Sequence, residues 1–301
     1  MEMHDSMRDE GSATRVKRHV VAHHQGIPTN DGDGVKLTRV IGSPKLMMLD
    51  PFLLLDCFES ENSQDYIGGF PTHPHRGFET VTYMLAGHMR HKDSRGHEGL
   101  IGPGGVQWMT AAKGIEHSEM PERDEGLFKG FQLWVNLPAS LKMATPEYQE
   151  YAAELIPTEY LSNGTEIRVI AGKTNSSIAG PVKGRHTAPL YLDVSVKENG
   201  SFDQFIPQGH NAFIFVIRGS VTVLSTPRES DITDSPIITA NELGVLSKGE
   251  QVSVLGGEAG GRFLLIAGQP LEEPVVRSGP FFMNTKEQIL QAYSDYRSGN
   301  F

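Results

Sequence analysis

Short β-type segments separated by Gly, Pro and Asn constrain the fold of this chain more than any other feature. Residues 16–23 and 34–41 alternate apolar and polar side chains, as half-buried strands do, and turn residues lie between them. Further strand-like runs are DPFLLLDCF, FETVTYMLAGHMRH, VQWMTAA, LFKGFQLWVNL, TEIRVIAG, PLYLDVSV, NAFIFVIRGSVTVL, NELGVLSKGEQVSVL and GRFLLIAG. Many short strands with little helix predict an all-β protein of the jelly-roll barrel type.

A faint internal repeat indicates that the barrel occurs twice. ETVTYMLAGHMRH resembles FIFVIRGSVTV, with a tight turn at Gly87 or Gly219, and PGGVQWMTAAKG resembles NELGVLSKGE. A chain of 301 residues is long enough for two domains. We therefore expect a flexible tail over 1–14, an N-terminal barrel over 15–145 and a C-terminal barrel over 146–301.

One short helix is predicted at the C-terminus. Thr285 can act as its N-cap, and Gln288 completes a capping box. Apolar residues at helical spacing follow: Ile289, Ala292, Tyr293 and Tyr296. The segment ASLKMATPEYQEY stays open between a helix start and an extended arm, because Pro146 permits either.

Charge, cysteine content and hydropathy exclude several classes of function. The net charge of -10 argues against direct nucleic-acid binding, because phosphate binding requires a basic face. A single cysteine, Cys57, allows no intrachain disulfide and fits a reducing compartment. The first residues lack the apolar region of a signal peptide, and no apolar run reaches the ~20 residues of a membrane helix. We expect a cytoplasmic monomer that does not bind membranes, with a nuclear location open in a eukaryote.

Two short patterns in a histidine-rich region predict a metal site. His73 and His75 form one i, i+2 pair, and His117 and Glu119 form another. In extended backbone, residues i and i+2 point to the same face, so two such strands inside a barrel bring four ligands together. Three imidazoles and a carboxylate suit a non-haem Fe²⁺ or another first-row divalent ion. Pro74 places the first pair on a strand at the mouth of the barrel.

The neighbouring residues leave alternatives open. Glu79 competes with Glu119 as the carboxylate ligand, because it follows His75 by four residues and is expected on the same strand face. Arg76 is interpreted as a structural ion-pair partner, and Trp108 and Met109 as core or as pocket wall. The remaining histidines of the region are interpreted as solvated loop residues: His88, His91 and His97.

Several long motifs resemble the pirin family of the cupin superfamily, over nearly the whole chain from Val16 onward. They are HPHRGFETVTYMLAG, VQWMTAAKGIEHSEMP, GLFKGFQLWVNLP, FLLIAGQPLEEPVV and GPFFMNTKEQI. The resemblance implies two cupin barrels, with iron in the first, ligated by the residues that match His73, His75, His117 and Glu119. It implies a second barrel without metal, in agreement with GHNAFIFVIRG, which carries only His210. Cys57 departs from the acidic residue that is usual in pirins.

The resemblance also implies two functions. The first is that of a quercetin 2,3-dioxygenase, which opens a flavonol ring with dioxygen and releases carbon monoxide, with Glu119 as the base. Apolar walls suit a flat ligand, and the residues expected to supply them are Phe78, Met84, Trp108 and Met109. The second is that of an iron-dependent, redox-sensing regulator that binds a transcription factor or a metabolic enzyme.

Overall fold

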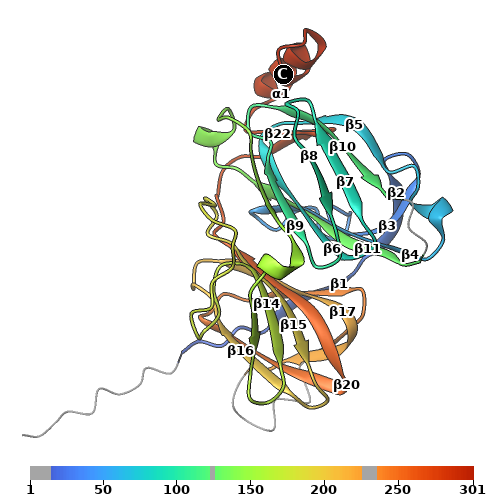
Figure 1. Cartoon of the computed structure of the whole chain (residues 1–301). Helices are drawn as coiled ribbons and strands as arrows, with labels where there is room; N and C mark the ends of the chain where they lie inside the picture. The colour runs from blue at the N-terminus through green and yellow to red at the C-terminus, as the bar shows by residue number, and fades with distance from the viewer. Residues whose placement is uncertain (1–14, 123–125, 226–235) are drawn as a thin grey trace, which may run out of the picture.

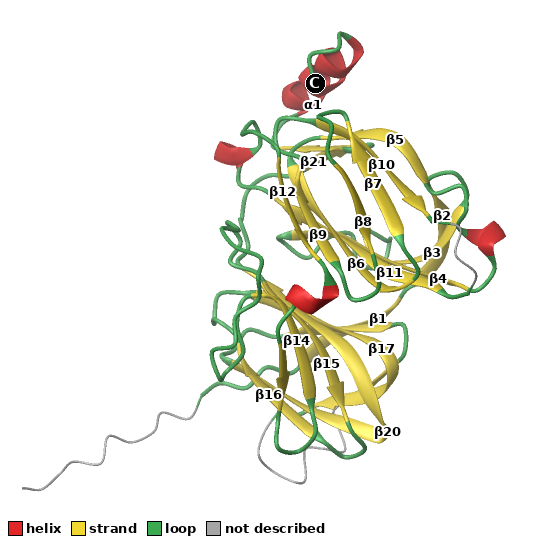
Figure 2. Cartoon of the chain, viewed as in Figure 1, coloured by secondary structure: helices red, strands yellow, loops and turns green. Residues whose placement is uncertain are grey.

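The computed structural model describes residues 15–122, 126–225 and 236–301, so the expected tail over 1–14 lies outside it. The described residues form two β-barrels that pack against each other, with the single α-helix at the far end of the first (Figure 1). Strands dominate both barrels (Figure 2). The expected all-β fold with two barrels and a C-terminal helix is confirmed. No helix in the described part of the chain combines the length and apolarity needed to cross a bilayer.

Two sheets form the first barrel. The larger has seven strands in the order β12-β9-β6-β11-β4-β3-β2, and the smaller has four in the order β5-β10-β7-β8. The strands of the larger sheet are β2 (Ile27–Asp31), β3 (Val35–Ile41), β4 (Phe52–Ser60), β6 (Phe78–Ala86), β9 (Val106–Thr110), β11 (Phe128–Asn136) and β12 (Glu147–Tyr151). Those of the smaller are β5 (Phe70–His75), β7 (Met89–Asp93), β8 (Glu98–Ile101) and β10 (Ile115–Pro121). Strand β5 is an edge strand, a position that tolerates Pro74, which has no backbone N–H to donate.

The second barrel is built around one nine-stranded sheet. Its strands are β1 (Val20–Gln25), β13 (Thr158–Tyr160), β14 (Glu166–Ala171), β15 (Leu190–Val196), β16 (Ser201–Phe205), β17 (Asn211–Val223), β18 (Ile237–Thr239), β19 (Glu242–Leu246) and β20 (Gln251–Gly268). A separate hairpin of β21 (Val276–Ser278) and β22 (Phe281–Met283) leads to helix α1 (Lys286–Arg297). Single 3-10 turns lie at Ser63–Asp65, Ala139–Leu141 and Ala153–Leu155.

The sheets do not follow the expected division at residue 145. Strand β1 pairs antiparallel with β19 and so belongs to the second barrel, although it precedes the first in the chain. Strand β12 pairs with β9 of the first barrel, so the ambiguous segment around Pro146 is an extended arm. The C-terminal hairpin and α1 also pack on the first barrel. Pairing between segments that are distant in sequence determines which barrel each strand joins, and local composition does not indicate that pairing.

A shared apolar core joins the two barrels. It combines one face of the seven-stranded sheet with residues of the nine-stranded sheet, and Trp108, Phe131, Tyr191, Phe213 and Leu264 are all buried in it. Side chains alternate along each strand, so the opposite face of the seven-stranded sheet points into the first barrel. That second face supplies much of the site described below.

The C-terminal segment is anchored to the first barrel. Thr285 and Gln288 form the expected capping box of α1. Arg76 makes the ion pair predicted for it, with Nη1 2.7 Å from Oδ2 of Asp295 in α1. The buried Nζ of Lys142 donates to the carbonyl of Gly77 at 2.6 Å and to that of β22 residue Phe282 at 3.0 Å. These contacts hold the hairpin beside β5.

Cys57 lies in the core between the barrels, whereas its neighbours Asp56 and Phe58 point the other way, into the first barrel. Burial raises the pKa of its thiol to about 12. We therefore expect Cys57→Ala to keep full metal loading, and we expect the native thiol not to react with a disulfide reagent at pH 7. Metal analysis and thiol titration before and after denaturation check this. Loss of metal at unchanged stability would contradict it.

Candidate metal centre

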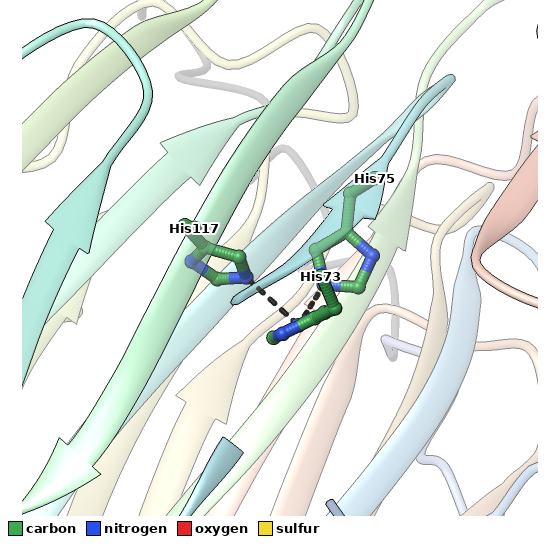
Figure 3. A group of neighbouring side chains, drawn as sticks. All are labelled: His73, His75 and His117. Carbon is green, nitrogen blue, oxygen red and sulfur yellow. Dashed lines mark hydrogen bonds between the residues drawn. The ribbon is translucent and has the colours of Figure 1, made fainter. Parts of the chain in front are cut away.

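Three histidines converge inside the first barrel. His73 and His75 come from β5, and His117 comes from β10, where it lies opposite His73 in the antiparallel register. The Nε2 atom of His73 is 2.9 Å from that of His75 and 3.1 Å from that of His117 (Figure 3). His73 and His75 of the first i, i+2 pair thus meet His117 of the second. Across the described residues, these three form the one group of His, Cys, Asp or Glu side chains with at least three ligand atoms within 4.8 Å.

The donor atoms of this cluster fit a bound cation. Nδ1 of His73 lies 2.8 Å from the Pro71 carbonyl, which can only accept, so the ring proton is on Nδ1 and Nε2 carries a lone pair. One lone pair cannot serve two close neighbours well, whereas a central ion would satisfy all three nitrogens. Nitrogen ligands about 2.1 Å from an ion in adjacent octahedral positions are about 3.0 Å apart, close to the two distances here.

The protonation states of the rings favour ligation. Burial lowers the pKa of His75 well below the usual histidine value, and His73 lowers it further. Burial also lowers the pKa of His117, with added effects from His75, His73 and His91. Neutral imidazoles are the form that binds metal, so these rings are ready to act as ligands at neutral pH.

Glu119 is buried in the wall of the same cavity, and its carboxylate is held in place. Thr82 Oγ1 donates to Oε1 at 2.7 Å, and Gln132 Nε2 donates to Oε2 at 2.7 Å. Its oxygens do not join the 4.8 Å cluster of the three imidazoles. Glu119 as a fourth ligand, or as a base beside the ion, therefore stays a proposal.

Glu79 does not line this cavity, contrary to the shared face expected from its spacing to His75. Gly77 adopts a positive φ of 91°, which ends β5 before β6 begins and breaks the alternation of faces. Within β6, Phe78 and Thr82 point toward the site, so Glu79 points away. Its Oε1 accepts from Thr110 Oγ1 at 2.7 Å and from Arg185 Nη1 at 2.7 Å. Arg185 is thus its ion-pair partner.

His91 corrects the interpretation of the loop histidines. It lies in β7, is only 1% exposed, and places Nδ1 3.4 Å from Nδ1 of the ligand candidate His117. His97 does have an exposed side chain, which contacts Asp93 at 3.0 Å, and His88 is half-buried. The strand pairing shows that His91 belongs to the site, because it lies opposite Glu119 across β7 and β10.

We expect His91→Ala to weaken metal binding by about 10- to 100-fold, the range typical for a side chain that orients a ligand. With Nε2 of His117 turned to the ion, its Nδ1–H donates to His91, which fixes the ring. Competitive titration with a chelator measures the change, and His97→Ala is the matched control. Equal affinities of the two variants would show that His91 does not orient the ligand.

A cavity of about 480 Å³ opens beside the cluster and is lined by two of its histidines, His73 and His75, together with Glu119. Its apolar wall comes from residues other than those expected. Phe78, Met84, Trp108 and Met109 are each at most 1% exposed, and none lines it. They fill close-packed core instead: Trp108 between the barrels, Met84 and Met109 in separate clusters, and Phe78 against Trp134 behind His75.

The wall that the structure shows comes from alternate residues of β4 and β11. Leu54, Asp56 and Phe58 face the cavity from β4, and Gln132 and Trp134 face it from β11. The ring of Trp134 lies 5.2 Å from that of His75. Flat side chains therefore extend directly from the histidines along one side of the cavity.

The C-terminal segment adds Arg277, Gly279 and Pro280 to this wall. The sequence alone assigns no role to these residues, because nothing local to GPFFMNTKEQI indicates that it packs on the first barrel. The backbone contact between Arg76 and Phe281 brings it there.

Comparison with known proteins places this architecture in a family. The family pattern for Pirin matches residues 34–135, and that for the Pirin C-terminal cupin domain matches residues 191–301. The chain belongs to the pirin family. A pirin-like protein of Caulobacter vibrioides is 49% identical over 92% of this chain and 96% of its own length. Human pirin is 43% identical over 96% of this chain and 94% of its own length.

A solved structure shares the arrangement of both pirin barrels. The crystal structure of quercetin 2,3-dioxygenase from Acinetobacter baumannii superposes with a TM-score of 0.83 at 34% identity, over 95% of this chain and 99% of that one. The expected cupin fold of two barrels is thereby confirmed.

Proposed function

We propose that this pirin is a metal-dependent dioxygenase that opens the ring of a flavonol such as quercetin, with iron held by His73, His75 and His117. The observation that carries the proposal is the cluster of three imidazole nitrogens beside a cavity that His73, His75, a buried carboxylate and an aromatic wall line. The likeness to the Acinetobacter enzyme supports it.

Different residues of the cavity would bind the ion, accept a proton and orient the substrate. A bound divalent ion would act as a Lewis acid that lowers the pKa of the flavonol 3-hydroxyl. Glu119, held by Thr82 and Gln132, is placed to accept that proton. Trp134 and the apolar residues of β4 orient the flat rings and exclude water from the reacting face.

The test is to incubate the iron-loaded protein with quercetin and dioxygen, and to follow loss of the flavonol absorbance and release of carbon monoxide. We expect turnover that depends on bound iron and that is lost in His73→Ala. Turnover no faster than with free iron would contradict the proposal. Binding of a protein partner that changes with the oxidation state of the iron would then favour the regulatory function.

A further inference from the structure

Arg277 is the one Lys or Arg among the described residues that line the metal cavity, where it joins the carboxylates of Asp31, Asp56 and Glu119. We propose that Arg277 binds a second, negatively charged group of the substrate, so that the cavity prefers flat aromatic anions to neutral flavonols. This inference rests on the proposed function, because it names the substrate class of the same cavity.

The guanidinium of Arg277 has no carboxylate partner among the residues that the structure describes. Arg39 engages both nearby acids: its Nη2 is 2.6 Å from Oδ2 of Asp56 and 2.7 Å from Oδ2 of Asp31. Arg277 makes one long contact, from Nε to the carbonyl of Gly279 at 3.5 Å. Arg277 is an exposed residue, but partial desolvation of its guanidinium, followed by the charge of Arg39, lowers its pKa, whereas the charges of Asp31 and Asp56 raise it. An anion that enters the cavity would find a guanidinium whose donors are not taken up by a carboxylate.

Two aromatic rings lie near the guanidinium of Arg277, and one of them contacts a histidine of the cluster. The Cζ atom of Arg277 lies 5.1 Å from the ring centroid of Phe282 and 5.9 Å from that of Trp134. Trp134 in turn contacts His75. A flat ligand stacked on Trp134 would therefore place one end at the histidines and the other near Arg277. Arginine binds planar anionic groups in a bidentate manner, so a carboxylate or sulfonate suits this end.

Removing the guanidinium of Arg277 should weaken the binding of an anionic ligand much more than that of a neutral one. Arg277 is exposed, and a bidentate, charge-assisted hydrogen bond to it corresponds to about a tenfold change in Kd. Without Arg277, the lining carboxylates would be left to repel an anion. A neutral ligand depends on the apolar wall and the ion, so its Kd should change by less than about twofold.

The experiment compares quercetin with quercetin 5′-sulfonate on zinc-loaded protein, because zinc has no redox chemistry and prevents turnover. Kd is measured by calorimetry for the parent, Arg277→Gln, Arg277→Lys and the control Arg297→Gln in α1. We expect the parent and the control to bind the sulfonate about tenfold more tightly than quercetin. We expect Arg277→Gln to lose that preference, and Arg277→Lys to keep part of it.

The inference is overturned if the parent shows no preference for the sulfonate, if Arg277→Gln keeps the preference, or if the parent binds neither ligand. Metal content and circular dichroism establish that the variants are folded and loaded. Quercetin turnover by the iron-loaded parent is a separate measurement. Turnover without the anion preference would reject the inference alone, whereas the preference without turnover would reject the proposed function alone.

Discussion

His73→Ala is expected to abolish stoichiometric metal binding while leaving the fold intact. Its Nε2 lies 2.9 Å from that of His75 and 3.1 Å from that of His117. Its side chain is only half-buried, so its loss removes a ligand without leaving a cavity in the core. Loss of a residue that only orients a ligand weakens metal binding by up to about 100-fold. Loss of the ligand His73 itself should weaken it by more than that. Metal content after dialysis against a weak chelator measures it.

The matched control for that variant is His210→Ala. His210 is the lone histidine in the stretch of the second barrel that corresponds to the His73–His75 motif, and it is buried. Its replacement should leave the metal content unchanged. If His73→Ala retains metal as well as His210→Ala does, the ion is not held at the three histidines.

The second large effect is expected at Glu119 and should distinguish it from Glu79. Glu119→Gln is expected to weaken iron binding more than Glu79→Gln, because it removes a negative charge beside the ion that neutral imidazoles cannot replace. It should also remove any flavonol cleavage, since Glu119 is the proposed base. Iron titration of both variants beside the parent provides the comparison.

Glu79→Gln should instead lower the free energy of unfolding. Glu79 is 1% exposed and its Oε1 lies 2.7 Å from Arg185 Nη1. The substitution therefore leaves the buried Arg185 side chain with one carboxylate, the more distant and exposed Glu147 at 3.5 Å. Breaking such a pair costs about 3 kcal/mol. Denaturant unfolding measures that loss. A greater loss of iron affinity in Glu79→Gln than in Glu119→Gln would show that the ligand assignment is wrong.

The parts of the site that local geometry controls were predictable from the sequence. His73, His75 and His117 meet because i, i+2 spacing in a strand is insensitive to the rest of the fold, and the two strands pair directly. The capping box of α1 is predictable for the same reason, because it involves residues three apart. Apolar alternation also indicates which segments form strands.

Features that depend on breaks in the strands or on distant contacts were not predictable. Gly77 resets the alternation between β5 and β6, so the face of Glu79 could not be counted from His75. Apolarity does not distinguish core from cavity wall, so the sequence leaves both interpretations of Trp108 open, and the structure places it in the core. Arg277 reaches the site only because the C-terminal hairpin packs on the first barrel.

The position of the bound ion tests the central claim most directly. Crystals of the iron-loaded protein, measured on both sides of the iron absorption edge, locate iron by its anomalous scattering. We predict one anomalous peak per chain, between the Nε2 atoms of His73, His75 and His117. No peak at that position, or a peak of equal height in the second barrel, would contradict the account.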